Sequence, residues 1–457
     1  MRKAVLILGM VLWGACGWSQ NWWNENWSYR LKITLKNSTA YKWKNLPVVI
    51  TGETLRKKTG LLKEAIATSS IRVVEPTGQE IPVQVDEKDG TGIYQATGNG
   101  QLDRDDEIVF PVSLKSGESQ SFFLYYREKL APLAEYPSEV KFEKIVYGEK
   151  NCFYNGRLSN KIISIGLRGS GTETGPDGKL MLGGLGKASI TSFVLEGKEL
   201  VYQGHSWGWN LLGGGYTVVA NLLPWSQPEL VVDGPVRKIV VCRALGVDKD
   251  FTREINPNWA LSGKVQGDYY RFFTLYAGIP YVTVSETVVI KQAEPKYSAL
   301  YEVAWCPTYP RDWEHDVMFL PLGGKAVTIT FPEERNYQTK KVEEGWFGIA
   351  NTKEKRGLAV FFEPEKAADI TVDFHAFHLK REQVLASDWS KKYAHAQARL
   401  WYRYDNFNLK PVQENRFGFW GLTGEDATGL AAIYQAVWGN ALVKEAVFGF
   451  PEEKQGK

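Results

Sequence analysis

Histidine, cysteine and methionine are scarce in this sequence, with 5, 4 and 4 copies among 457 residues. There is no CxxC pair, HExxH, P-loop, dinucleotide fingerprint or GxSxG. The signatures of zinc fingers, zinc proteases, nucleotide-binding folds and α/β-hydrolases are therefore missing. No cluster of Lys or Arg stands out and the net charge is only +3, so nothing favours nucleic-acid binding. Cys16 lies in a predicted signal peptide, described below, whose removal would leave Cys152, Cys242 and Cys306. We expect these three cysteines to be buried free thiols.

The one conspicuous apolar run, Ala4–Leu12, follows a basic start and is too short to span a membrane. We predict that residues 1–19 are a secretory signal peptide. Ala15-Cys16-Gly17 has small residues at the offsets that ordinary signal peptidase requires, and cleavage there would release an exported protein. Lipidation of Cys16 would instead anchor it to a membrane, although Trp13 stands where the lipobox prefers Leu. In both cases we expect a periplasmic, outer-membrane-anchored or extracellular protein.

The sequence is rich in residues of short strands and turns, with 44 glycines, 20 prolines and 13% aromatics. Tyr29–Lys36 alternates strictly between apolar and polar residues, as a half-buried strand does. No strand–helix alternation is present. We therefore predict a mainly β protein, with a small N-terminal β-barrel or sandwich at 20–137 and a large antiparallel β-supersandwich at 138–382.

The C-terminal segment, 383–457, is expected to differ. Ala, Leu and Ile at helical spacing predict a helix over 426–446 that packs on the sandwich. Residues 387–399 are predicted to form a second helix, and the polar residues 452–457 are expected to be frayed.

Two stretches carry a family resemblance. The first comprises Ile81–Asp86, Gly98–Asp103 and Asp105–Phe110, and the second comprises Asp233–Arg237 and Arg271–Val282. Together they resemble the N-terminal barrel-like domain and central β-sandwich of exo-acting rhamnogalacturonan-lyase-like proteins. The central part is also similar to the wider galactose-mutarotase-like supersandwich group. The resemblance covers about residues 22–382, without the helical toroid of those lyases. It implies a carbohydrate ligand and supplies no catalytic residue.

Charged residues interrupt three apolar strand faces. Glu286 does so within 281–290, and Arg271 and Glu302 do so on nearby strands. A buried carboxylate needs a partner or a raised pKa, so these three are candidate catalytic groups. They would line one cleft if their strands are neighbours. The alternative, which we favour at this point, is a structural ion pair between Glu286 and an arginine.

Two aromatic loops carry the other candidates. His205 precedes two indoles, whose faces can stack on sugar rings while the histidine acts as a base. The second loop combines aromatics with Arg311 and His315, as a site for an acidic sugar does. The alternatives are packing of the loops onto the sandwich and, for His375, a solvated strand face. The predicted substrate-binding residues are Trp207, Trp209, Trp305, Tyr309, Trp313 and His375.

An acidic turn follows Gly98-Asn99-Gly100. Asp103, Asp105 and Glu107 place oxygen ligands at alternating positions, which suits Ca²⁺. The spacing of an EF-hand loop is not met, and a solvated acidic turn is the alternative that we favour.

These observations predict an exported carbohydrate-active protein, with a lyase acting by β-elimination on uronate-containing polysaccharide or oligosaccharide as the specific hypothesis. Such a lyase needs a base, here His205, His315 or a tyrosine, and a cation such as Arg271 or Arg311. The alternative is a non-catalytic glycan-binding or cell-envelope structural β-sandwich protein. A third option, sugar epimerisation, rests on the mutarotase-like fold alone.

Overall fold

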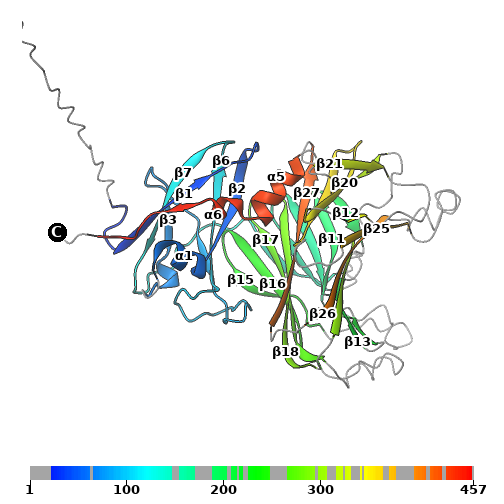
Figure 1. Ribbon diagram of the computed structural model, residues 1–457. Helices are drawn as coiled ribbons and strands as arrows, with labels where there is room; N and C mark the ends of the chain where they lie inside the picture. Colours follow the sequence, from blue (N-terminus) through cyan, green and yellow to red (C-terminus); the bar gives the residue numbers. More distant parts are fainter. Residues whose placement is uncertain are drawn as a thin grey trace, which may run out of the picture.

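The structure, a computed structural model, forms two β-rich bodies side by side (Figure 1). The residues that it describes are 22–61, 65–146, 154–169, 188–202, 207–213, 216–219, 225–247, 265–293, 297–305, 315–322, 325–330, 340–341, 344–363, 370–376, 396–407, 412–424 and 429–454.

Two sheets build the N-terminal domain. Its elements are β1 (Tyr29–Lys36), β2 (Trp43–Thr51), α1 (Gly52–Thr59), η1 (Thr68–Ser70), β3 (Arg72–Val74), β4 (Glu80–Ile81), β5 (Gln84–Asp86), β6 (Glu107–Leu114) and β7 (Ser119–Tyr126), joined by β28 (Val447–Phe448) and β29 (Glu452–Glu453). One sheet has the order β28-β1-β7-β3-β4, with β29 also on β1, and the other has the order β2-β6-β5. The alternation predicted for β1 is confirmed, because Leu31, Ile33 and Leu35 are fully buried.

Three antiparallel sheets build the second domain. A five-stranded sheet, order β12-β11-β10-β9-β8, contains β8 (Lys141–Lys144), β9 (Gly156–Ser159), β10 (Ile163–Arg168), β11 (Ser189–Leu195) and β12 (Lys198–Tyr202). A nine-stranded sheet, order β15-β16-β17-β18-β27-β24-β23-β20-β21, contains β15 (Glu229–Asp233), β16 (Arg237–Val247), β17 (Val265–Tyr276), β18 (Tyr281–Ala293), β20 (Asp316–Leu322), β21 (Lys325–Thr330), β23 (Trp346–Asn351), β24 (Arg356–Phe361) and β27 (Val412–Thr423). A six-stranded sheet, order β14-β13-β19-β26-β25-β22, contains β13 (Trp207–Gly213), β14 (Tyr216–Val219), β19 (Tyr297–Trp305), β22 (Lys340–Lys341), β25 (Ile370–Ala376) and β26 (Ala396–Phe407).

The predicted mainly β, antiparallel fold is confirmed. Apolar residues of the five-stranded and nine-stranded sheets meet in one core, which includes Ile165, Phe193, Phe273 and Phe419. Along each strand of such a pair, alternate side chains enter the core while the others face away. The nine-stranded sheet therefore keeps a second face, and part of that face meets the N-terminal domain.

The C-terminal segment departs from expectation in three ways. The sandwich continues past 382, because β26 and β27 lie inside its sheets. Residues 396–399 begin β26 rather than a helix, and 387–395 lie outside the described residues. The helix predicted over 426–446 is broken into α5 (Leu430–Ile433), a π-helical turn (Tyr434–Trp438) and α6 (Ala441–Lys444). Asn440 lies between the last two with a left-handed φ of 49°, which a continuous helix does not allow.

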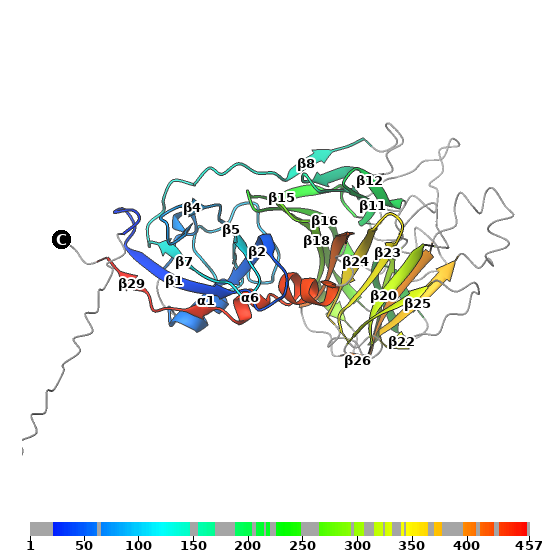
Figure 2. The same ribbon diagram turned by 90° about the horizontal axis from the view of Figure 1, so that it is seen from above.

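The end of the described chain is not frayed, as had been expected for 452–457. β28 and β29 both pair with β1, and Arg30 binds Glu452 at 2.7 Å. Figure 2 shows this segment running from the sandwich back along the N-terminal domain. Residues 455–457 lie outside the described residues.

One apolar core joins the two domains. It contains Ile33 and Phe110 of the N-terminal domain, Tyr281 and Trp420 of the sandwich, and Leu430 of α5. A shared core of this kind opposes hinge motion between the domains. Among the described residues, no helix is both long and apolar enough to cross a membrane.

Candidate functional site

Strand β18 presents two different faces. Val282, Val284 and Glu286 point into the sandwich core, whereas Tyr281, Thr283 and Ser285 alternate with them on the other face. The register places Thr274 of β17 opposite Thr283, and Arg416 of β27 opposite Ser285. The face of the sheet that is turned from the core is therefore lined with hydroxyl and charged groups.

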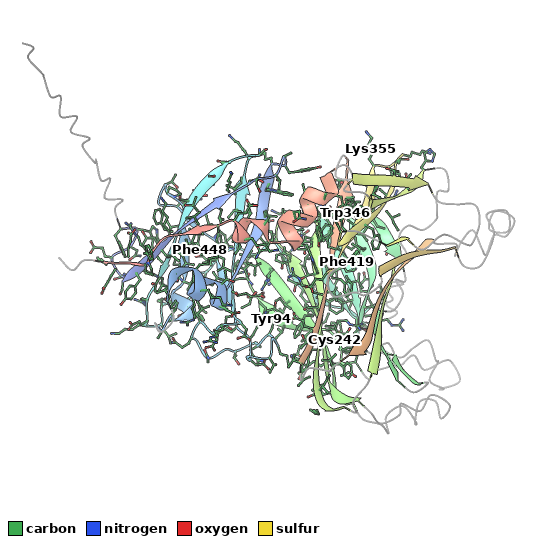
Figure 3. All side chains as sticks on the ribbon, in the orientation of Figure 1. Tyr94, Cys242, Trp346, Lys355, Phe419 and Phe448 are labelled. Atoms are coloured by element: carbon green, nitrogen blue, oxygen red, sulfur yellow. The ribbon has the colours of Figure 1, made fainter. Side chains whose placement is uncertain are left out.

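A cavity of about 160 Å³ lies between this polar face and the N-terminal domain. Both domains and the C-terminal segment contribute to its walls. Its polar lining consists of Thr51, Lys88, Tyr94, Glu107, Arg237, Thr274, Tyr276, Tyr281, Thr283, Ser285, Glu414, Arg416 and Asn440. Tyr94, labelled in Figure 3, lies where the two domains meet.

A buried ion network forms one wall. Arg237 donates from Nε to Asp86 Oδ2 at 2.7 Å and contacts Glu107 through Nη2. Lys88 binds Glu107 Oε1 at 2.8 Å, and the Tyr94 hydroxyl donates to Glu107 Oε2 at 3.0 Å. Arg237 and Asp86 are each only 2% exposed. The two cations and two carboxylates balance in charge, as buried ions must.

Gln84 ties this network to the start of β16. Its amide oxygen accepts from the backbone N–H groups of Val236 and Arg237 at 2.8 and 2.9 Å, and its amide nitrogen donates to Asp86 Oδ1 at 2.7 Å. Gly234 makes this approach possible, because a Cβ there would lie 2.1 Å from Gln84 Oε1. The two stretches that carry the family resemblance thus meet at this point.

The network shifts the pKa values of its members in opposite directions. Burial opposes ionisation of Glu107, but the charges of Arg237 and Lys88 outweigh it and hold the Glu107 pKa well below its usual range. Burial raises the pKa of Asp86, and there it outweighs the attraction of Arg237. Burial likewise raises the pKa values of Tyr94 and Tyr281, so both phenols keep their protons at neutral pH.

Arg416 stands apart from this network. Its guanidinium lies over the Trp438 ring, 4.5 Å from the centroid, and no salt bridge of Arg416 is found within the described parts of the chain. Tyr281, which is 1% exposed, carries a hydroxyl that lies beside the Arg416 guanidinium and finds no hydrogen-bond acceptor among the described residues. Its ring stacks on Tyr276 with the centroids 5.3 Å apart. The cavity therefore holds donors of Arg416 and Tyr281 for which the described residues supply no carboxylate or carbonyl acceptor.

Arg271 and Glu286 form the ion pair that the sequence suggested. They lie opposite each other on β17 and β18, and Arg271 donates to Glu286 Oε2 from Nε at 3.0 Å and from Nη2 at 2.6 Å. A third donor atom, Nη1, bonds to the carbonyl of Ala188 at 2.7 Å. The pair is 0% and 1% exposed inside the sandwich core, so no polysaccharide can touch it in this conformation.

The other predicted catalytic residues lie on other elements or outside the described residues. Glu302 lies on β19 of the six-stranded sheet, whereas Arg271 and Glu286 belong to the nine-stranded sheet. His315 precedes β20, three strands from β27, which is a separation of about 14 Å across the sheet. Its backbone carbonyl accepts from the N–H of Thr352 at 2.8 Å. His205 and Arg311 lie outside the described residues.

The predicted sugar-binding positions fall mostly on the six-stranded sheet. β13 and β19 pair so that Gly208 lies opposite Glu302, and β25 and β26 pair so that His375 lies opposite Gln397. For the candidates on these strands the structure describes the backbone alone. These are Trp207, Trp209, Trp305 and His375, and Tyr309 and Trp313 lie outside the described residues.

The acidic turn is not arranged as a calcium site. Asp103 Oδ2 accepts from Asn99, Asp105 Oδ2 accepts from the Gly90 N–H, and Glu107 is held by Lys88 and Arg237. Among the described residues, no three His, Cys, Asp or Glu side chains are grouped so that they could hold a metal ion. The carboxylates instead accept local hydrogen bonds, as turn residues do.

Cys242 is a buried free thiol, as expected, and burial raises its pKa to about 12. A thiol of this kind is unreactive at neutral pH. Cys152 lies outside the described residues, as does Cys306.

Four residues of this cavity were not predicted as site residues from the sequence: Arg416, Tyr281, Lys88 and Tyr94. The feature of the sequence that could have indicated this site is the polar face of the strand over 281–290. It alternates with the apolar face that Glu286 interrupts. Alternation shows that a face is polar, but it does not show whether water or a second domain covers it.

No protein-family model matches this chain, and a sequence comparison with curated proteins finds no match. A glycosyl hydrolase family 38 protein from Enterococcus faecalis is similar in structure, with a TM-score of 0.46 and 11% identity, over 93% of this chain and 47% of that one. A galactose mutarotase related enzyme from Lactobacillus acidophilus gives a TM-score of 0.37 and 9% identity, over 58% and 97% of the two chains. The α-N-acetylgalactosaminidase NagBb from Bifidobacterium bifidum gives 0.40 and 12%, over 62% and 39%.

This chain spans about half the length of the Enterococcus protein. At these TM-scores the similarities support no conclusion about its activity, and the function has to be argued from its own residues.

Proposed function

We propose that this protein is an exported carbohydrate-active protein that holds a sugar in the cavity between its two domains. The observation that carries the proposal is the composition of the cavity wall. Tyrosine rings stand beside the hydroxyl groups of Thr274, Thr283 and Ser285, in a cavity lined by both domains. Aromatic faces suit the C–H faces of a sugar, and fixed hydroxyl and charged groups suit its hydroxyls.

The size of the cavity limits the ligand. At about 160 Å³ it is roughly half the lower end of the usual range for ligand pockets. It corresponds to the volume of about five water molecules at about 30 Å³ each. One sugar ring or the end of a chain therefore fits better than the middle of a polysaccharide. The export that we propose rests on residues 1–19, which lie outside the described residues.

β-Elimination on uronate-containing glycans is the more specific form of the proposal. The cavity offers cations for a carboxylate, but Tyr94 and Tyr281 are protonated at neutral pH and are poor bases there. Non-catalytic glycan binding is the second candidate. It is favoured by the separation of the predicted catalytic residues, since Arg271 and Glu286 are sealed in the core and His315 lies several strands away.

A panel of pectic, alginate-type and glycosaminoglycan polysaccharides tests both candidates. Binding would be followed by isothermal titration calorimetry, and cleavage by the ultraviolet absorbance of the unsaturated product, with and without Ca²⁺. Binding with a rise in absorbance on one polymer would establish a lyase and its sugar class. Binding without product from any polymer would favour the non-catalytic protein. Absence of binding to every polymer and to their constituent monosaccharides would refute the proposal.

A further inference from the structure

We propose that Arg416 and Tyr281 form a carboxylate subsite in the interdomain cavity, so that the sugar held there is acidic. The inference deepens the proposed function, because it names the class of ligand for the same cavity. The first observation is the charge balance of the residues around the cavity. Arg237 and Lys88 are neutralised by Asp86 and Glu107, whereas Arg416 has no carboxylate at ion-pair distance among the described residues.

The surroundings of Arg416 leave its donors available. Arg416 lies on β27 opposite Ser285 of β18, and Trp438 covers its guanidinium from 4.5 Å. An indole over one face of a guanidinium stabilises the charge without using its N–H groups, which point outward in the plane. Those groups form the planar fork that matches a carboxylate with two parallel hydrogen bonds.

Tyr281 supplies a neutral donor beside this cation. Its ring is held between Tyr276 and Trp420, with centroid distances of 5.3 and 6.0 Å. Its buried hydroxyl lies beside the Arg416 guanidinium, but no described group accepts a hydrogen bond from it. A buried hydroxyl without an acceptor costs free energy, and a ligand oxygen that accepts from it removes that cost. A protonated phenol can donate to a carboxylate, which accepts hydrogen bonds but donates none.

Two carboxylates line the cavity, and of these Glu107 is already paired with Lys88 and Arg237, which leaves Glu414 to oppose an anion. Glu414 lies two residues before Arg416 on β27 and lines the same cavity, but its side chain is exposed to water. Exposure weakens its repulsion of an anion, because water screens the interaction. The balance at the inner part of the cavity is therefore positive, and removal of the Glu414 charge should tighten the binding of an acidic ligand.

The test uses the purified full chain and four monosaccharides, D-glucuronate, D-galacturonate, D-glucose and D-galactose, with affinity measured by calorimetry. We expect at least one uronate to bind at least about tenfold more tightly than its neutral counterpart. Arg416→Gln should lower uronate affinity by about tenfold or more, and Tyr281→Phe by a few-fold, because each removes donors to the carboxylate. Glu414→Gln should raise it by a few-fold.

Arg356→Gln is the matched control, since Arg356 is a partly exposed arginine of the same sheet that pairs with Glu196 at 3.3 Å. It should leave uronate affinity unchanged. Thermal unfolding of each variant shows whether it is folded. Should Arg416→Gln fail to fold, Tyr281→Phe and Glu414→Gln still test the subsite, because their expected effects have opposite signs.

The two proposals fail in different ways. If polysaccharides bind but uronates and neutral sugars bind equally, and the variants change nothing, the carboxylate subsite is refuted while the proposed function stands. If uronate monosaccharides bind through Arg416 but no polysaccharide binds or reacts, the subsite stands and glycan processing does not. If no uronate binds the folded wild-type protein, the cavity holds water only and the subsite is refuted.

Discussion

Two charge clusters lie on opposite faces of one sheet, and one of them borders the cavity between the two domains. Arg271 and Glu286 face the sandwich core, where apolar side chains enclose them. Arg237 and Arg416 face the N-terminal domain, around a cavity of about 160 Å³. Both clusters pair an arginine with a carboxylate, and Arg271, Glu286, Arg237 and Asp86 are each at most 2% exposed. Burial of charge therefore does not locate a binding site by itself, and the space beside the charge is the distinguishing feature.

The clusters also differ in completeness. The core cluster is one cation and one carboxylate, although Glu286 Oε1 has no partner among the described residues. The interface cluster balances Arg237 and Lys88 against Asp86 and Glu107 and then adds Arg416. A cation that is paired with a carboxylate inside the core has a structural role, whereas an additional cation beside a cavity is available to bind a ligand.

The largest effect is expected from Arg237→Met, which leaves Asp86 and Glu107 buried without their common partner. Removal of one member of a buried ion network lowers the free energy of unfolding by about 3–5 kcal/mol. Because this variant leaves two carboxylates without their cation, we expect a loss at the upper end of that range. The free energy of unfolding from urea denaturation measures the effect. Arg243→Met, at a more exposed arginine of the same strand that pairs with Glu229, should cost about 1 kcal/mol or less. Equal costs for the two variants would contradict a special role for the interface network.

Replacing both residues of the core pair together should cost less stability than replacing one of them. Arg271→Met alone should cost about 3 kcal/mol, because Glu286 stays charged or must take up a proton in the core. The double variant Arg271→Met/Glu286→Met should recover most of that loss, since apolar side chains suit this core. A double-mutant cycle by urea denaturation measures the coupling between the two residues. The folded double variant should also keep its glycan affinity, and loss of that affinity would place the pair in the site after all.

The smallest effect concerns Asp106, which lies beside the interface network. It is 1% exposed, and its oxygens accept from the N–H groups of Lys88 at 2.8 Å and Asp103 at 2.6 Å. Burial outweighs those bonds and raises the Asp106 pKa to about 6. Between about pH 4 and pH 6 the folded protein then binds more protons than the unfolded chain does, so this residue lowers stability as the pH rises.

The Asp106 contribution should stay below about 1.4 kcal/mol per pH unit, the limit for one proton. Carboxyl-carbon chemical shifts followed by NMR measure the titration directly. A midpoint near 4, the ordinary value for an aspartate, would contradict the prediction. Asp106→Asn should remove the contribution of this residue to the pH dependence of unfolding.

Much of the fold follows from local pattern. The alternation of Tyr29–Lys36 and of 281–290 defined two strands and their buried faces, since one face of each must leave water. The apolar surroundings of Glu286 also indicated its ion pair with an arginine, because a lone charge there is too costly. These conclusions need only neighbours along the chain and the energetic cost of burial.

The errors arose where partners come from distant parts of the chain. Residues 396–399 can form a helix by composition, yet they begin β26, which pairs with β19 on one side and with β25 on the other. Glu452 and Glu453 are polar and were expected to fray, yet β1 offers them backbone partners and Arg30 an ion pair. Sheet pairing overrides local propensity because each added strand satisfies its backbone groups at once.

By itself, the sequence determined the mainly β class, the faces of the clearest strands and the need of a buried Glu286 for an arginine partner, because alternation and the cost of burying charge act locally. Only the tertiary structure decided which polar face would meet a second domain. It brought Gln84–Asp86, Glu107 and Arg237 together and left Arg416 beside a cavity with Tyr281. Those contacts join residues more than one hundred positions apart, and their energies depend on distance and enclosure, which a linear pattern does not contain.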